Sequence, residues 1–173
     1  MSNFLALDVS TSCVGWATGD EDSIKDHGYV RLDKEKPDDW RHYDLIQLLT
    51  PEIEDEIEQA EVVIVEDAAK KYGGMTTRRS ITVLVEFNAV TRYEMNRRGK
   101  DVLRYHPNTA RKESRLDRGI KPDSYDDTKQ WILDAVSEEF DIEWSMTRYD
   151  NIRKQHEDEA DAIVLGSAYV EQQ

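Results

Sequence analysis

The apolar residues of this chain fall in short runs, and the first run shows a pattern that later ones repeat. Phe4-Leu5-Ala6-Leu7 is a continuous apolar run, as expected of a strand that is covered on both faces of its sheet. The run leads directly into Asp8. A carboxylate cannot remain ionised inside such a core without a partner. We therefore expect Asp8 to lie at the edge of a cleft or beside a cation.

A second buried strand ends in the same way. The β-branched run Val62–Val65 leads into Glu66, 58 residues after Asp8. Shorter apolar or alternating runs predict three further strands, at Val14–Thr18, His27–Leu32 and Val102–His106. The two strands that end in acids are expected to bring them to one edge of a sheet.

Helical spacing of apolar residues accounts for most of the remaining chain. It predicts helices over Asp38–Ile57, with a second helical piece starting at Pro51, and over Thr77–Arg98, Asp123–Phe140 and His156–Val170. Gly99 is well placed to stop the helix Thr77–Arg98. Arg111–Lys121 is expected to be a loop or a frayed helix, and Asp141–Arg153 has no clear pattern. Strands that come first as a meander and then alternate with helices predict one mixed α/β domain over residues 1–173.

The last predicted helix carries a pair of acids near its start. Asp158 and Asp161 are three residues apart and therefore share a helix face, which continues as Leu165 and Ala168. If that face packs on the sheet, the two carboxylates point at the sheet edge. Aspartate at a helix start is also common for a simpler reason, because it interacts favourably with the helix dipole.

Together the four acids Asp8, Glu66, Asp158 and Asp161 predict a metal site. Carboxylate oxygens are the ligands that Mg²⁺ prefers, and two such ions can drive hydrolysis of a phosphodiester. Four carboxylates that converge without a cation would repel one another severely. Taken alone, Asp8 is also typical of a turn residue at a strand end. The same interpretation fits Glu66 poorly, because a β-branched run leads directly into it.

The order of these acids resembles that in the RuvC family of Holliday junction resolvases. The matching motifs are Ala6-Leu7-Asp8-Val9-Ser10, Ile64-Val65-Glu66 and Asp158-Glu159-Ala160-Asp161. The resemblance spans nearly the whole chain. It implies a ribonuclease H-like fold, with a central mixed five-stranded sheet flanked by helices. It also implies a homodimeric endonuclease that uses two Mg²⁺ ions, with Mn²⁺ as an alternative, to nick opposed strands of four-way DNA junctions. The dimer is expected to use the helix Thr77–Arg98, whose Ile81, Val85 and Phe87 offer more apolar surface than one core face uses. The compact chain would suit a phage or viral member.

Charge distribution is compatible with a DNA partner although the net charge is −14. Residues 68–121 hold 14 Lys/Arg against 5 Asp/Glu, and the remainder is strongly acidic. A basic segment of this kind can hold phosphates, or it can simply be part of a highly charged, solvated surface. The residues expected to contact DNA are Lys70, Lys71, Tyr72, Arg78, Arg79, Arg111, Lys112, Arg115 and Lys129.

Three positions depart from the family pattern or allow two interpretations. The family commonly has an aromatic wedge where this chain has Ala69, and Tyr72 either replaces it by stacking on a base or is an ordinary loop residue. Lys129 is the nearest match to a basic residue of the family, or an exposed helix lysine. His156 either assists the metal site or is a solvated residue at a helix start. Cys13 and Trp16 are assigned to packing only.

Composition limits the alternatives. The single cysteine, Cys13, excludes an intramolecular disulfide and a cysteine-based zinc cluster. No signal peptide and no membrane-spanning run is apparent, so we expect a cytoplasmic protein, in the host-cell cytoplasm if it is viral. Two other functions remain open: a nuclease of the same fold acting on other branched DNA, and a non-catalytic acidic module that binds a protein partner.

Overall fold

The computed structural model describes residues 3–32, 42–67, 78–114, 116, 125–148 and 152–173. Five strands form one sheet: β1 (Phe4–Val9), β2 (Cys13–Gly19), β3 (Ile24–Arg31), β4 (Val62–Glu66) and β5 (Asp101–Tyr105). Their order is β3-β2-β1-β4-β5. The first three strands pair antiparallel, whereas β1, β4 and β5 run parallel. The predicted mixed five-stranded sheet is therefore confirmed.

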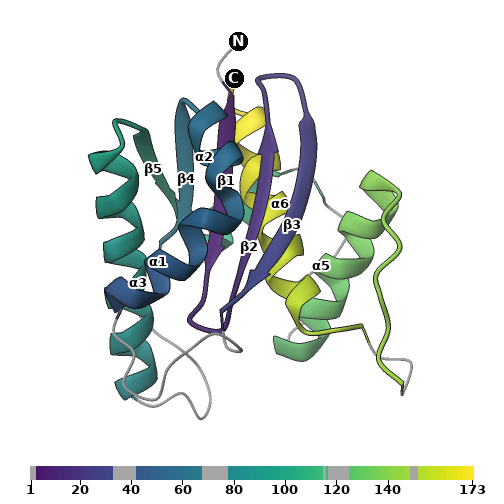
Figure 1. Cartoon of the computed structure of the whole chain (residues 1–173). Coiled ribbons are helices and arrows are strands. Elements are labelled where there is room, and N and C mark those ends of the chain that lie inside the picture. The colour runs from purple at the N-terminus through teal and green to yellow at the C-terminus, as the bar shows by residue number, and fades with distance from the viewer. Residues whose placement is uncertain (1–2, 33–41, 68–77, 115, 117–124, 149–151) are drawn as a thin grey trace.

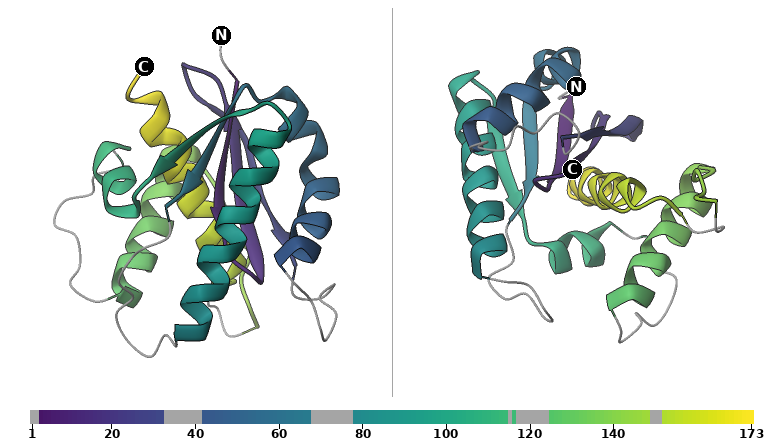
Figure 2. Two further views of the ribbon diagram at one scale, coloured as in Figure 1. Left: turned by 90° about the vertical axis from the view of Figure 1, so that its left-hand side faces the viewer. Right: turned by 60° about the horizontal axis from the view of Figure 1, so that its bottom comes forward.

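Helices cover both faces of this sheet (Figure 1). One face carries α1 (His42–Leu49), a 3₁₀ turn η1 (Thr50–Ile53), α2 (Glu54–Gln59) and α3 (Arg78–Arg97). On the other face α6 (Gln155–Val170) lies against the strands, and α4 (Pro107–Glu113) and α5 (Tyr125–Phe140) contact α6. The two turned views show α5 beyond α6, away from the sheet (Figure 2).

Two hydrophobic cores follow from this layering. Alternate residues of β1 point to opposite faces, so Leu5 and Leu7 pack under α1, α2 and α3, whereas Phe4 and Ala6 pack under α6. This explains the continuous apolar run at Phe4–Leu7, because both faces of the strand are covered. The helix α6 is buried nearly all round its middle, from Ala162 to Tyr169.

Most predicted boundaries agree with the observed elements, and the main difference is α4. Pro107 was expected only to end a strand, and the segment from Arg111 was expected to be a loop or a frayed helix. Instead Pro107 occupies the first turn of α4, where its missing N–H has no partner to lose. His106 caps this helix by accepting a hydrogen bond from the Asn108 backbone N–H. Gly99 follows the C-terminal end of α3. It has φ +77° and stops this helix, as predicted.

None of the described helices is both long enough and apolar enough to cross a membrane.

Candidate metal centre

Strand pairing brings the first two acids together. The parallel strands β1 and β4 pair Leu7 with Val65. The next residue on each strand is Asp8 and Glu66, so their side chains belong to the same edge of the sheet. The backbone carbonyl of Glu66 accepts a hydrogen bond of 2.6 Å from the Asn88 amide of α3, which fixes the end of β4.

The first turn of α6 reaches the same place because of a glycine. Gly15 on β2 lies directly opposite Asp8 in the antiparallel ladder. A Cβ atom at Gly15 would lie only 1.9 Å from the backbone oxygen of Asp158, so any larger residue would push α6 away. Two residues earlier on β2, the Cys13 thiol donates a hydrogen bond to the Asp158 carboxylate. Asp158 therefore lies next to the ladder position of Asp8.

The acids perturb one another strongly. Burial raises the pKa of Asp8 well above its usual range, and the neighbouring charges of Glu66, Asp161 and Asp158 raise it further. Burial and the nearby Asp161 carboxylate raise the pKa of Glu66 to about 8. Burial also raises the pKa of Asp158 to about 6, although the Cys13 hydrogen bond and Lys129 oppose the shift. Such coupled shifts are typical of functional carboxylate clusters.

Among the described residues, Arg111 contributes positive charge to this cluster. The Arg111 guanidinium on α4 donates a hydrogen bond to Asp161 Oδ1 at 3.2 Å, and both side chains are largely buried. Burial alone would lower the pKa of Arg111, but Asp161, Glu66 and Asp8 together hold it above its usual value. Arg111 was predicted to contact DNA, and that role stays a prediction; in this structure its guanidinium pairs with Asp161.

A second cation lies at the rim of the cluster. Lys129 on α5 forms an ion pair with Glu157, and its charge also acts on Asp158. Its side chain is only 22% exposed, so it is not an ordinary solvated helix lysine.

The donor set suits a hard divalent cation. The four acids offer only carboxylate oxygens. Burial, together with neighbouring carboxylates, raises the pKa values of Asp8, Glu66 and Asp158, and the positive charge of Arg111 does not cancel these shifts at Asp8 and Glu66. Among the residues that the structure describes, no three His, Cys, Asp or Glu side chains are already spaced as ligands of one ion. The donor types of the four acids therefore fit a divalent cation, and Asp161 is paired with Arg111.

The other predicted site residues are distributed differently. Lys70, Lys71, Tyr72 and Arg115, and the wedge position Ala69, lie outside the described residues. Arg78 and Arg79 begin α3, but their side chains are not described. Lys112 follows Arg111 on α4 and is exposed.

His156 is not solvated, and its ring nitrogens face Glu159 and Ser145, not the four predicted metal ligands. Its Nδ1 lies 2.6 Å from Glu159 Oε2 and its Nε2 lies 2.6 Å from the Ser145 hydroxyl. The side chain is buried against the rings of Tyr29 and Trp144.

Sequence reasoning missed three residues around the cluster: the thiol of Cys13, the amide of Asn88 and the ion-pairing role of Arg111. Cys13 was assigned to packing because it lies in an apolar strand. Its spacing of two from Gly15 places both on one face of β2, which is a signal for contact with α6 once Gly15 is known to face that helix. Nothing in the sequence alone links Asn88 to Glu66.

Solved structures share this fold. RuvC of Thermus thermophilus in complex with a Holliday junction substrate superimposes with a TM-score of 0.58 at 10% identity, over 97% of this chain and 92% of that chain. The yeast mitochondrial Holliday junction resolvase Ydc2 gives a TM-score of 0.64 at 14% identity, over 98% and 78% of the respective chains. The predicted ribonuclease H-like, RuvC-type fold is therefore confirmed. No protein-family model and no curated protein sequence matches the chain.

The coupled carboxylates make the stability of the metal-free protein depend on pH. Glu66 has a pKa of about 8 when folded and an ordinary value of 4.5, so the folded state binds more protons between these values. Stability must then fall as pH rises through this window. We expect the unfolding temperature without divalent ions to decrease between pH 6 and pH 8, by roughly 2–4 °C for each kcal/mol lost.

The control for this prediction is Glu66→Gln, which removes one of the carboxyl groups with a raised pKa and should make the decrease shallower. Asp8 and Asp158, whose pKa values are also raised, remain in this variant. Other carboxyl groups with lowered pKa values, such as Glu94 at about 2, titrate well below pH 6 and do not contribute. An equally steep decrease in Glu66→Gln would show that Glu66 is not the group responsible. Differential scanning fluorimetry with chelator over the pH series measures both proteins.

Proposed function

We propose that this chain is a divalent-metal-dependent DNA endonuclease of the RuvC type that cuts four-way junctions by hydrolysing opposed phosphodiesters. The observation that carries the proposal is the cluster of Asp8, Glu66, Asp158 and Asp161, gathered from β1, β4 and α6 on a fold shared with two Holliday junction resolvases. Low identity to both resolvases means that the function rests on the cluster and not on the fold alone.

Each part of the cluster has a role in this proposal. The four carboxylates would hold two Mg²⁺ or Mn²⁺ ions. When bound, the ions supply an activated water and stabilise the leaving oxygen of the phosphodiester. Asp8 lies between the other ligands, since Glu66 is on the neighbouring strand and Asp158 lies over its ladder partner. Lys129, which acts on Asp158, and the exposed Lys112 of α4 are the described basic residues that would hold phosphates in this proposal.

Cleavage tests the role of the central ligand. Asp8→Asn keeps the shape of the side chain but removes its negative charge, so cleavage of a labelled four-way junction should fall at least about a hundredfold. Junction binding in a gel-shift assay should remain, because phosphate contacts supply most of the affinity. Loss of binding together with cleavage would instead make Asp8 a structural residue.

The same gel assay separates the possible substrates. Four-way junctions, forks, flaps and linear duplex should be compared at equal concentration with wild-type protein. Preferential cutting of forks or flaps would redirect the proposal to other branched DNA. No cleavage of any of these DNAs, together with no binding of Mn²⁺ or Mg²⁺ in calorimetry, would favour an acidic module that binds a protein partner.

In this proposal a metal ion and Arg111 would compete for the Asp161 carboxylate. Because Arg111 competes for the same carboxylate, we expect Arg111→Ala to bind Mn²⁺ about tenfold more tightly in calorimetry, equivalent to ~1.4 kcal/mol. Lys112→Ala is the matched control, since it removes the same charge from the next residue of α4, where the side chain is exposed. Its Mn²⁺ affinity should stay close to wild type. Weaker binding in Arg111→Ala would show that Arg111 orders the ligands instead of competing with metal.

A homodimer would place two such sites on one junction, and α3 offers a surface for it. Val85, Ala89 and Tyr93 are spaced four residues apart, and Val85 and Tyr93 are 42% and 70% exposed. Phe87 was expected to belong to this surface together with Ile81 and Val85, but it is fully buried in the core beneath α3. That part of the prediction is wrong.

We expect the wild-type chain to be a dimer in sedimentation velocity experiments, and Tyr93→Glu to shift it to monomer. A charge at the centre of an apolar contact costs more than the contact gains. Gln130→Glu adds a charge on the exposed side of α5 and should leave the dimer intact. A wild-type monomer at micromolar concentration, or a dimer that tolerates Tyr93→Glu, would exclude this surface.

A further inference from the structure

A chain of hydrogen bonds begins one residue after Asp158. Glu159 is buried, and its two carboxylate oxygens have different partners. Oε1 lies 2.7 Å from His27 Nδ1 on β3, and Oε2 lies 2.6 Å from His156 Nδ1 on its own helix. His156 Nε2 continues the chain to the Ser145 hydroxyl at 2.6 Å. One carboxylate therefore links the edge of the sheet, α6 and the segment that follows α5.

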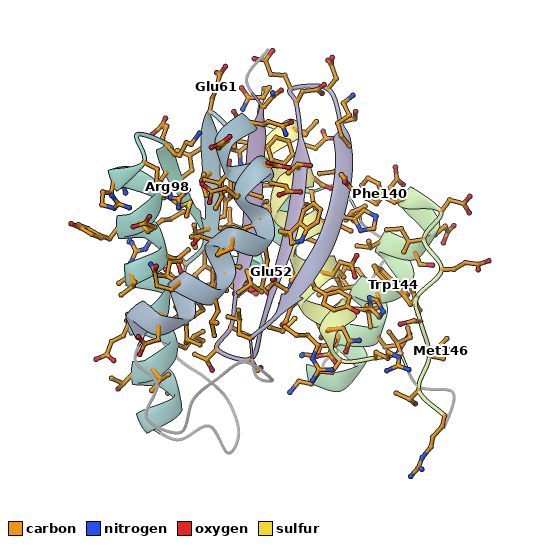
Figure 3. All side chains as sticks on the ribbon, in the orientation of Figure 1. Glu52, Glu61, Arg98, Phe140, Trp144 and Met146 are labelled. Carbon is orange, nitrogen blue, oxygen red and sulfur yellow. The ribbon has the colours of Figure 1, made fainter. Side chains whose placement is uncertain are left out.

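The two ends of this chain are firmly held. His27 and Tyr29 alternate on β3 and share the face toward α6, where the Tyr29 ring packs edge-on against His156. On the other side, Trp144 packs on His156 and its indole N–H donates to the Leu133 carbonyl of α5. Trp144 is seen beside α5 in Figure 3. The hydrogen bonds of Glu159 therefore run between elements that do not move independently.

The position of Glu159 on α6 determines what this series of hydrogen bonds constrains. Successive helix residues are about 100° apart, so Glu159 points away from the face that carries Asp158 and Asp161. The crossing of α6 over β2 at Gly15 allows close contact, but a glycine has no side chain to interlock with the helix. Close packing at Gly15 therefore does not fix the rotation of the first turn of α6 about the helix axis. Other contacts must set this rotation.

We propose that Glu159, held by His27 and His156, is a positioning clamp that sets the rotation of α6 and so aims Asp158 and Asp161 at Asp8. This inference rests on the proposed metal-dependent function. A buried ionic network is a poor source of net stability, since apolar residues of similar size often do as well. Its directional hydrogen bonds do fix orientation, and a ligand pair on one helix turn needs that.

The order Ser145, His156, Glu159 is also that of a nucleophile, a base and an orienting carboxylate in hydrolases. In such a triad the carboxylate orients the histidine, whereas here Glu159 is shared equally with a second histidine on β3. This sharing favours the clamp.

The test changes His27, which lies on β3 and contacts none of the proposed ligands in the described interactions. His27→Ala removes one anchor of Glu159 and leaves every residue of α6 in place. We expect its Mn²⁺ affinity, measured by calorimetry, to fall about tenfold or more while unfolding stays cooperative. His27→Asn places an amide N–H near the position of the ring Nδ1 and should restore affinity to within about threefold of wild type.

A matched control removes a buried hydrogen bond from the far end of the same helix. Ser167 donates to the Ile163 carbonyl at 2.9 Å, about two turns beyond Asp161. Ser167→Ala removes this hydrogen bond far from the proposed ligands and should leave the Mn²⁺ affinity unchanged. Equal loss of affinity in both variants would show general destabilisation, and wild-type affinity in a folded His27→Ala protein would overturn the clamp.

Two further outcomes are distinguishable. If the wild-type protein itself binds no Mn²⁺, the proposed function fails, and the role of the clamp in placing metal ligands fails with it. Covalent labelling of Ser145 by a fluorophosphonate probe, lost in His156→Ala, would replace the clamp by a hydrolase triad. Absence of labelling together with the His27 results above supports the clamp.

Discussion

The fold brings four carboxylates together, and the repulsion among them is the constraint on which the surrounding contacts depend. β1 and β4 are parallel and in register, so Asp8 and Glu66 must be neighbours wherever these strands pair. A glycine opposite Asp8 then lets the first turn of α6 approach to backbone contact, which adds Asp158 and Asp161. In a partly buried environment such charge is costly, and the raised pKa values of Asp8, Glu66 and Asp158 are the consequence.

Several surrounding contacts can be understood as responses to this repulsion. Arg111 pairs with Asp161 from α4, Lys129 acts on Asp158 from α5, and the Cys13 thiol donates to Asp158 from β2. The pKa values of Asp8, Glu66 and Asp158 stay raised despite these contacts, which is why we propose a divalent cation as a further partner. Under the proposed function, Arg111 and a metal ion would be alternative partners of Asp161, so metal binding would be coupled to the release of Arg111.

The sequence was informative wherever local pattern determines geometry. Two buried runs that end in acids were enough to predict that Asp8 and Glu66 share a sheet edge, and the spacing of Asp158 and Asp161 placed them on one helix face. Tertiary contacts were harder. The ion pair between Arg111 and Asp161 was not predicted, because no local pattern shows which side chain of a basic segment turns inward. Phe87 looked available for a dimer, because one helix face was judged wider than the core needs.

The link between His27 and Glu159 was invisible for the same reason, since 132 residues separate the two. Likewise, α4 was only partly predicted because a proline that ends a strand can equally begin a helix. What single-sequence reasoning lacks here is the packing of α4, α5 and α6 around one edge of the sheet.

The most direct test of this account is the anomalous scattering of crystals soaked in Mn²⁺. Two peaks are expected between Asp8, Glu66, Asp158 and Asp161, at oxygen–metal distances of about 2.0–2.4 Å, with the Arg111 guanidinium moved off Asp161. Crystals that show no peak at saturating Mn²⁺, with Arg111 still bound to Asp161, would contradict the account.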